Sequence, residues 1–180
     1  CRIIGKRFLL AHILFQQEII EVATFRACSS TNKEAKILAH DNTFGTIEQD
    51  VLRRDFTLNA LYYNPVDQQI VDLVGGIKDL DNRVLRVIGN PATRFQEDPV
   101  RMIRAVRYAA KLSLSLDTEL KEALLKKGSL ILHVPKARLL EEFYKCFLQE
   151  RALDIFKLMH HMKIARYVVP REVLKTSLVK

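Results

Sequence analysis

Residues 94–108 read RFQEDPVRMIRAVRY. If this stretch is helical, the carboxylate of Asp98 and the guanidinium of Arg101 lie about one turn apart. Asp98 is a favourable N-cap and Pro99 suits the first helical position, so the sequence predicts a helix that begins there. Asp98 can accept a hydrogen bond from an exocyclic amine while Arg101 donates to the adjacent ring nitrogen. Adenine and cytosine present this donor and acceptor pattern on their Watson–Crick edges. The plainer alternative is a helix cap followed by a solvated basic face.

The predicted helix is amphipathic. At about 100° per residue, its apolar side chains fall on one half of the cylinder. The other half carries Arg101, Arg104, Arg107 and Lys111, with Tyr108 among them. The helix therefore has one face for a hydrophobic core and one face for an anionic group.

Composition narrows the class of protein. The chain has 180 residues and a formal net charge of +8, so phosphate-bearing partners are the first expectation, although a basic chain without one is common. Three widely spaced cysteines argue against a zinc site or a disulfide framework and favour a reducing compartment, for which we expect the cytoplasm. No run approaches the roughly 20 apolar residues that span a bilayer. Because the chain begins with Cys1 in apparent strand, we expect a fragment that starts inside a domain.

The first half of the chain is predicted to contain β-structure. Residues 3–15 and 18–27 flank Gln16-Gln17 and predict an antiparallel hairpin, in which Glu21 lies among apolar neighbours. Residues 28–43 are polar and turn-rich, which favours a loop. The other elements expected here are a helix over 46–54 opened by Thr46, a strand or helix through 61–63, a strand over 69–74, a bend at Gly75-Gly76, a helical turn over 77–82 and a strand over 83–88.

The second half is predicted to be helical after a boundary at Gly89-Asn90-Pro91. Pro135 is expected to start one helix and Pro170 to end the last. The expected helices cover 92–97, 99–113, 117–127, 136–148 and 150–163. Strands followed by helices predict an α+β part and then an all-α part.

Three ordered stretches resemble motifs of the class II nucleotidyltransferases, the bacterial poly(A) polymerases and CCA-adding tRNA nucleotidyltransferases. They are RRDFTLNALYYNP, DLVGGIKDL and VLRVIGNPATRFQEDPVRMIRAVRYAAKL. The resemblance covers roughly residues 1–150, and IIEVATFR, GTIEQD and LYYNP look closer to the poly(A) polymerases. It implies a partial nucleotidyltransferase head over 1–89, with a mixed or antiparallel sheet and helices, a helical neck over 90–149 that reads base and RNA, and the start of a helical body over 150–180.

The resemblance also implies a ribose site in RRDFTLNA. Asp55 would accept from the ribose hydroxyl and so select NTP over dNTP. Arg54 would assist it, Arg53 would face phosphate, and Asn59 would hold the sugar or phosphate. The alternative is a basic pair at a helix end with Asp55 as a cap. DLVGGIKDL corresponds to the hinge between head and neck, where two glycines permit a bend; a plain tight turn is compatible with this.

Glu97-Asp98-x-x-Arg101 matches the family's base-reading motif. Asp98 and Arg101 would pair with the nucleobase, and Glu97 would orient Arg101 by a charge-assisted hydrogen bond. Arg104 and Arg107 could touch the triphosphate, or only pair with acids of the head.

The metal-binding motif is absent from these residues. In this family an RNA 3′-hydroxyl attacks the α-phosphate of ATP, pyrophosphate leaves, and two Mg²⁺ ions stabilise the attacking and leaving oxygens. The Asp-x-Asp motif that holds the ions would lie upstream of Cys1. We reject Asp79-Leu80-Asp81 as the metal site because it belongs to the hinge, so no metal ligand is assigned. Glu21 matches a third acidic position and could assist the metals or accept from a backbone amine; a hydrogen-bonded buried glutamate is the alternative.

The function expected for the full-length parent is template-independent addition of AMP from ATP to RNA 3′ ends. Its partners would be RNA 3′ ends and ATP, with no membrane. One alternative is a CCA-adding tRNA nucleotidyltransferase, since the Asp98 and Arg101 pair suits both A and C. The other is a non-catalytic remnant that binds RNA or nucleotides.

Overall fold

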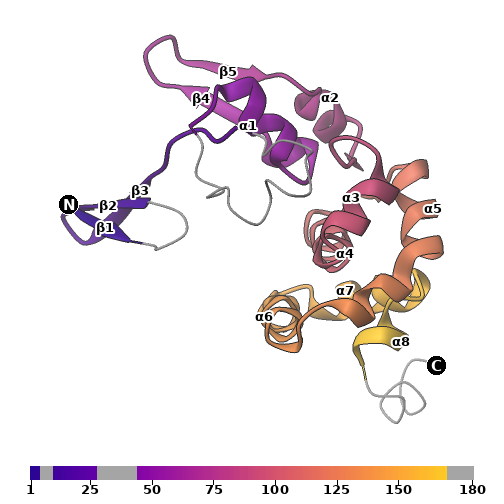
Figure 1. Cartoon of the computed structure of the whole chain (residues 1–180). Helices are drawn as coiled ribbons and strands as arrows, with labels where there is room; N and C mark the ends of the chain where they lie inside the picture. Colours follow the sequence, from indigo (N-terminus) through magenta and orange to yellow (C-terminus); the bar gives the residue numbers. More distant parts are fainter. Residues whose placement is uncertain (5–9, 28–43, 170–180) are drawn as a thin grey trace, which may run out of the picture. The chain divides into compact units, whose positions relative to one another are not determined.

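A computed structural model describes residues 1–4, 10–27 and 44–169 of the chain. The chain forms two compact units, Cys1–Arg54 and Asp55–Lys180, each of which is described by itself (Figure 1). Strands precede a helical part, which confirms the expected α+β class. In the described ranges, no helix has both the length and the apolar character needed to cross a membrane.

The first unit contains a three-stranded antiparallel sheet and one helix. The strands are β1 (Arg2–Ile4), β2 (Leu10–Phe15) and β3 (Glu18–Val22), in the order β1-β2-β3. The hairpin of β2 and β3 is confirmed, and Gln16 at its turn has a φ of 56°. The prediction of one strand over 3–15 is wrong, because β1 and β2 are separate strands that pair with one another. The loop expected over 28–43 lies outside the described residues.

Helix α1 (Ile47–Arg53) begins where the sequence predicted. Thr46 accepts from the backbone N–H of Gln49, and the Gln49 side chain accepts from the backbone N–H of Thr46. This reciprocal cap satisfies two donors that a helix start otherwise leaves without partners.

The second unit begins with short elements between Asp55 and Leu85. They are the 3₁₀ helix η1 (Thr57–Asn59), the antiparallel pair β4 (Leu61–Asn64) and β5 (Gln69–Asp72), helix α2 (Gly76–Asp81), and strand β6 (Val84–Leu85), which pairs in parallel with β7 (Ser115–Leu116). The strands expected over 69–74 and 83–88 are therefore shorter than predicted. Beyond β6, Val87 makes an isolated bridge to Phe56.

The expected helices of the second unit are all present. They are α3 (Pro91–Glu97), α4 (Val100–Leu112), α5 (Thr118–Lys127), α6 (Lys136–Phe147) and α7 (Ala152–His161). The sequence missed the 3₁₀ helix η2 (Gly128–His133) and helix α8 (Ala165–Val168). Pro170, expected to end the last helix, lies outside the described residues. The domain boundaries proposed at residues 89 and 149 stay a prediction.

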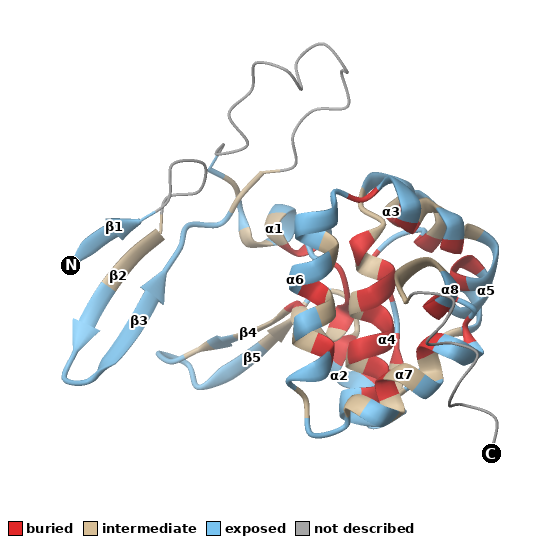
Figure 2. Ribbon diagram, turned by 90° about the horizontal axis from the view of Figure 1, so that it is seen from below, coloured by how far each residue is buried: buried red, intermediate tan, exposed pale blue. Residues whose placement is uncertain are grey.

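Helix α4 is the centre of the core of this unit, as the buried residues along it show (Figure 2). Its apolar face contains Met102, Ile103 and Val106, which are fully buried, and α6 and α7 pack against the helix. Burial of each such side chain stabilises the fold by about 1.5–3 kcal/mol. The core therefore fixes the position of the polar side chains that α4 carries.

The glycine pair forms a tight bend whose two residues have different roles. Gly75 has a φ of +79°, in the left-handed region that favours glycine. A Cβ on Gly76 would lie 2.5 Å from the carbonyl oxygen of Thr57, so Gly76 is needed for this close approach of two backbones. Asp72 closes the bend, because its carboxylate accepts from the N–H groups of Val74, Gly75, Gly76 and Ile77.

Candidate nucleotide-binding site

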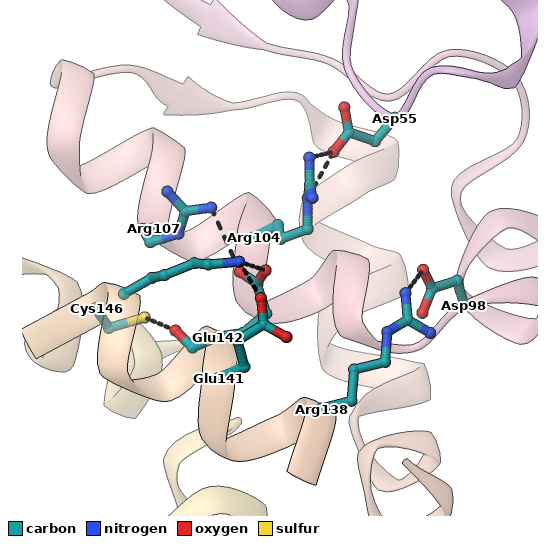
Figure 3. Close-up of polar contacts among 9 residues, drawn as sticks. Asp55, Asp98, Arg104, Arg107, Arg138, Glu141, Glu142 and Cys146 are labelled. Carbon is teal, nitrogen blue, oxygen red and sulfur yellow. Dashed lines mark hydrogen bonds and ion pairs between the residues drawn. The ribbon is translucent and has the colours of Figure 1, made fainter. Parts of the chain in front are cut away.

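Asp55 is buried at the start of the second unit, and its carboxylate accepts hydrogen bonds from three donors. Oδ1 accepts from the backbone N–H of Phe56 at 2.9 Å and from Asn59 Nδ2 at 3.0 Å. Oδ2 accepts from Nε of Arg104 at 2.8 Å, and Nη2 of the same guanidinium lies 2.6 Å from Oδ2 in the ion pair (Figure 3). Of the two roles considered for Arg104, the structure therefore shows the pairing with an acid of the predicted head, Asp55.

Arg104 is held on α4 by charge and by an aromatic ring. Burial lowers the pKa of Arg104, but the attraction of Asp55, Tyr108 and Glu142 outweighs that effect, so its pKa lies above the ordinary value. Its guanidinium carbon lies 5.8 Å from the centre of the Tyr108 ring, and this ring also meets buried Phe56 edge-on. The segment after Asp55 is therefore attached to α4 by an ion pair and an aromatic contact.

A second hydrogen-bond network joins the same segment to the residues around the bend at Gly75-Gly76. Thr57 Oγ1 donates to Asp79 Oδ2 at 2.7 Å, and Arg86 Nε donates to the same oxygen at 2.9 Å. Arg86 Nη2 also donates to the carbonyl of Val74. Asp79 and Arg86 thus hold the segment that follows Asp55, a contact that the sequence does not predict because these residues lie far apart in the chain.

The start of α4 carries the expected contact between Glu97 and Arg101. Arg101 Nη1 donates to Glu97 Oε2 at 3.0 Å and to the carbonyl of Arg94 at 2.9 Å, and Arg94 also donates to Glu97 at 2.9 Å. In the described part of the chain, Nε and Nη2 of Arg101 have no hydrogen-bond partner and are not fully buried. These donors are available to a ligand.

Asp98 lies just before α4 and is held by two contacts. The helix begins at Val100, with Pro99 as its cap, one residue later than predicted. Asp98 Oδ1 nevertheless accepts from the backbone N–H of Val100 at 3.2 Å, so its carboxylate still caps the turn. Oδ2 accepts from Arg138 Nη2, on α6, at 2.6 Å (Figure 3). No local pattern pointed to Arg138, which lies 40 residues away.

Arg107 does not lie on a solvated basic face, which was the plainer alternative for this helix. It is buried, and its Nη2 lies 3.4 Å from Glu142 Oε2 on α6 (Figure 3). Lys145 Nζ donates to the other oxygen of Glu142 at 2.9 Å, and hydrogen bonds from Lys145 to Glu141 and Glu142 raise the pKa of Lys145. The solvated alternative is wrong because α6 packs on that side of α4, which periodicity within α4 cannot reveal; contact of Arg107 with a triphosphate stays a prediction.

The first unit contains a basic pocket of about 300 Å³. Its lining includes three guanidinium groups, from Arg26, Arg53 and Arg54, and the carboxylate of Asp50. Arg54 Nε donates to Asp50 Oδ2 at 3.0 Å, and the backbone N–H of Arg26 donates to Asp50 Oδ1 at 3.3 Å. Arg53 and Arg54 were predicted site residues; Arg26 was not.

Glu21 differs from the prediction in its burial. Its side chain is 64% exposed, and His12, its partner in the strand register, lies 3.3 Å away across β2 and β3. The alternative in which Glu21 is buried and hydrogen-bonded is wrong, since every residue of β3 is exposed.

The described residues were also compared with the ligand sets that bind a magnesium ion. No group of three or more His, Cys, Asp or Glu side chains is placed among these residues to hold an ion. The two Mg²⁺ ions implied by the resemblance therefore do not fit these residues, and no chemical step is assigned to them.

Two family models match the chain. Residues 1–86 match the "Poly A polymerase head domain", and residues 113–172 match the "Probable RNA and SrmB- binding site of polymerase A". With the fold and the motifs above, these matches define the class of protein: the chain belongs to the class II nucleotidyltransferase family of poly(A) polymerases and CCA-adding enzymes.

Curated relatives lie in both branches of the family. Poly(A) polymerase I of Escherichia coli O6:H1 is 46% identical over 168 residues, which are 88% of this chain and 36% of that protein. Poly(A) polymerase I of Haemophilus influenzae is 44% identical over 178 residues, 94% of this chain and 39% of that protein. The CCA-adding enzyme of Bacillus subtilis is 39% identical over 149 residues, 83% of this chain and 37% of that protein. The chain thus spans well under half the length of these relatives.

Solved structures give the same family. The CCA-adding enzyme of Bacillus stearothermophilus in complex with CTP superposes with a TM-score of 0.77 at 26% identity, over 92% of this chain and 39% of that one. A tRNA nucleotidyltransferase complexed with a primer tRNA and an incoming ATP analog gives a TM-score of 0.75 at 28% identity, over 95% of this chain and 49% of that one.

Proposed function

We propose that the protein containing this chain adds AMP from ATP to RNA 3′ ends without a template, and that this chain recognises the nucleotide. The supporting observation is that Asp55 and Asn59 belong to the same compact unit as helix α4, to which the ion pair of Asp55 and Arg104 joins them. The 46% identity to a poly(A) polymerase I, against 39% to a CCA-adding enzyme, favours adenylation.

The proposed roles follow the chemistry of each side chain. Asp55 with Asn59 reads the ribose, and Arg53 and Arg54, which directly precede Asp55, take the phosphates. Asp98 accepts from the base amine, Arg101 donates to the ring nitrogen, and Glu97 orients Arg101. Arg107 supports α4 through Glu142. Glu21 remains a proposed helper of the reaction, and Mg²⁺ and a cytoplasmic location remain proposals that rest on the family and on cysteine usage.

CCA addition to tRNA is the second candidate. An acceptor beside a donor suits cytosine as well as adenine, and one structural neighbour is a CCA-adding enzyme bound to CTP. Base preference measured with both nucleotides separates the two functions.

The test uses the natural full-length product that contains this chain, a labelled RNA primer, Mg²⁺ and each NTP in turn. A poly(A) polymerase should add a long tract from ATP alone, whereas a CCA-adding enzyme should add CMP and stop after a fixed number of residues. Arg101→Ala should reduce ATP use and flatten the preference among the four NTPs. A wrong base leaves a donor facing a donor and an acceptor facing an acceptor. Each such mismatch costs about 1–3 kcal/mol, so the two together give roughly 10²–10⁴-fold discrimination between bases.

Asp55→Ala tests the sugar site in the same assay. Use of ATP should fall far more than use of dATP, because the loss affects recognition of the 2′-hydroxyl. An unchanged ratio of ATP to dATP would remove the ribose role from Asp55. Primer extension with no nucleotide preference at all would contradict the proposed function.

A further inference from the structure

Helix α6 has apolar side chains on the side that faces away from α4. Its buried residues Glu142 and Cys146 lie on the side of α4, where Glu142 meets Arg107. At about 100° per residue, the exposed apolar residues fall on nearly the opposite side of the helix. Both kinds of residue occur along α6 in Figure 2. The exposed apolar residues, with exposures between 51% and 81%, are Leu140, Tyr144, Phe147 and Leu148.

These four residues, which we call the outer face of α6, differ from the usual exposed side of a surface helix. Such a side normally carries charged and polar residues, and a helix that is apolar on both sides is normally buried. Here the large apolar side chains follow one another over about 12 Å of helix. A single exposed leucine needs no explanation, but a continuous apolar surface marks an interface.

Aromatic contacts hold the outer face in a defined position. The ring of Phe147 lies 4.8 Å from the ring of Phe143, one turn earlier on α6, and 4.8 Å from the ring of Phe156 on α7. The rings of Phe143 and Phe156 are 5.5 Å apart. Because α6 and α7 together fix Phe147, little conformational entropy remains to be lost when a partner covers this face.

The described chain ends beside the outer face. A pocket of about 130 Å³ lies between α6 and the last residue of α8, Val168. The described residues stop one position later, at Val169, so the polypeptide that continues from there starts next to α6. The residues that line the pocket are Lys136, Leu139, Leu140, Phe143 and Val168.

Length and tethering favour this continuing polypeptide as the occupant. The matched residues are only 36–39% of the length of the curated relatives, so most of a full-length product lies outside them. A segment joined by a short linker has an effective concentration in about the millimolar range, which favours it over a separate molecule at lower concentration.

We propose that the outer face of α6 is an interface inside the natural full-length product, and that the polypeptide following Val169 covers it with apolar side chains. This interface goes beyond the proposed function and does not depend on which nucleotide is added to RNA. The helix is then enclosed between α4 and the later part of the same polypeptide.

The experiment compares α6 in two contexts, the 180-residue chain and the full-length product. Amide hydrogen exchange of residues 136–148 is followed by mass spectrometry of peptides. Exchange should be at least about 10-fold slower in the full-length product, as expected when even one such side chain becomes buried. Equal exchange in the two contexts would overturn the proposal without any variant.

Leu148→Gln supplies the second readout. Leu148 is 81% exposed in the structure, so the variant should leave exchange of α6 in the 180-residue chain nearly unchanged. In the full-length product it should remove most of the slowing, because an amide would replace an apolar contact at the interface. The matched control is Val66→Gln, which changes an 87% exposed residue outside α6 and should keep the slowing. An equal effect of the two variants would contradict a specific interface.

Other occupants give other results. A full-length product that dimerises in analytical ultracentrifugation, and loses both the dimer and the slowing in Leu148→Gln, would assign the face to a second copy and overturn the proposal. If Leu148→Gln weakens binding of an RNA oligonucleotide but leaves the slowing intact, the face contacts RNA and the proposal is wrong. A product that shows the slowing but adds no nucleotide to RNA would contradict only the proposed function.

Discussion

Arg107 on α4 and Glu142 on α6 form an ion pair in which both side chains are buried, with exposures of 10% and 7% and an N–O distance of 3.4 Å. Arg107 Nε is buried as well and makes no hydrogen bond to the described residues. Because the contact is long and Arg107 Nε has no acceptor among these residues, the desolvation of the two charges offsets much of their attraction. The ion pair therefore joins α4 to α6, but its two charged side chains lose most of their hydration when they are buried.

Removing one partner of this pair should destabilise the protein strongly. We expect Glu142→Ala to lower the free energy of unfolding by about 3–5 kcal/mol, because it leaves the Arg107 charge buried without its main partner. Urea denaturation of the chain measures this change. The control is Glu122→Ala, which breaks the exposed pair of Glu122 and Lys126 and should change the free energy of unfolding far less, because solvent screens that pair. Equal costs for the two variants would contradict a buried role.

Arg138 should affect base preference through Asp98. Its Nη2 lies 2.6 Å from Asp98 Oδ2, and with the N–H of Val100 it fixes the plane of that carboxylate. We expect Arg138→Ala to lower the ratio of ATP to GTP use by about 10-fold, as for the loss of one oriented hydrogen bond. Arg138→Lys keeps the charge and should retain part of the ratio. A uniform loss for both nucleotides would instead indicate general binding or stability.

Asp72 should make the bend at Gly75-Gly76 sensitive to acid. Partial burial raises the pKa of Asp72, but four backbone N–H donors outweigh this and lower the pKa below its ordinary value of 3.8. The folded state thus prefers the ionised form, so the stabilisation is present above pH 3.8 and is lost as the pH falls through the lower, folded-state pKa.

Asp72→Asn tests this expectation. At pH 6 it should destabilise the chain by about 1 kcal/mol, a value typical of lost capping interactions. Near pH 3 the difference between variant and wild type in urea denaturation should shrink. A difference that stays constant across this range would show that ionisation of Asp72 does not contribute.

Cys146 should behave as a buried, protonated thiol. Burial raises its pKa from 9.0 to about 11, and its Sγ donates to the carbonyl of Glu142 at 3.3 Å. Since the unfolded chain ionises first, the stability due to this group is complete below pH 9 and declines as the pH rises towards 11. Two pKa units correspond to at most about 3 kcal/mol.

Alkylation measures the accessibility of this thiol. In a Cys1→Ser/Cys28→Ser variant kept reduced, Cys146 should react with iodoacetamide at pH 8 far more slowly than in urea. In the complementary Cys146→Ala variant, the decline of stability between pH 9 and 11 should be smaller than in the wild type. Rapid alkylation of the native protein would show that the site opens readily.

The local elements were determined by the sequence because their causes lie close together in the chain. Thr46 and Gln49 are three residues apart and cap α1, and Gly75 takes the positive φ that its bend requires. The apolar period of α4 predicted its buried face, and the spacing of Glu97 and Arg101 predicted their hydrogen bond. Ordered motifs also identified the family, since three of them occur in sequence.

The partners of the charged residues were decided only by the tertiary structure. Helical periodicity placed Arg104 and Arg107 on one polar face, yet each meets a carboxylate from a distant part of the chain: Asp55 and Glu142. Arg138 reaches Asp98 across 40 residues, and Arg107 is buried because α6 covers it. Ion pairs depend on distance in space, which packing of the core sets, whereas a sequence pattern records only which side of a helix a residue occupies.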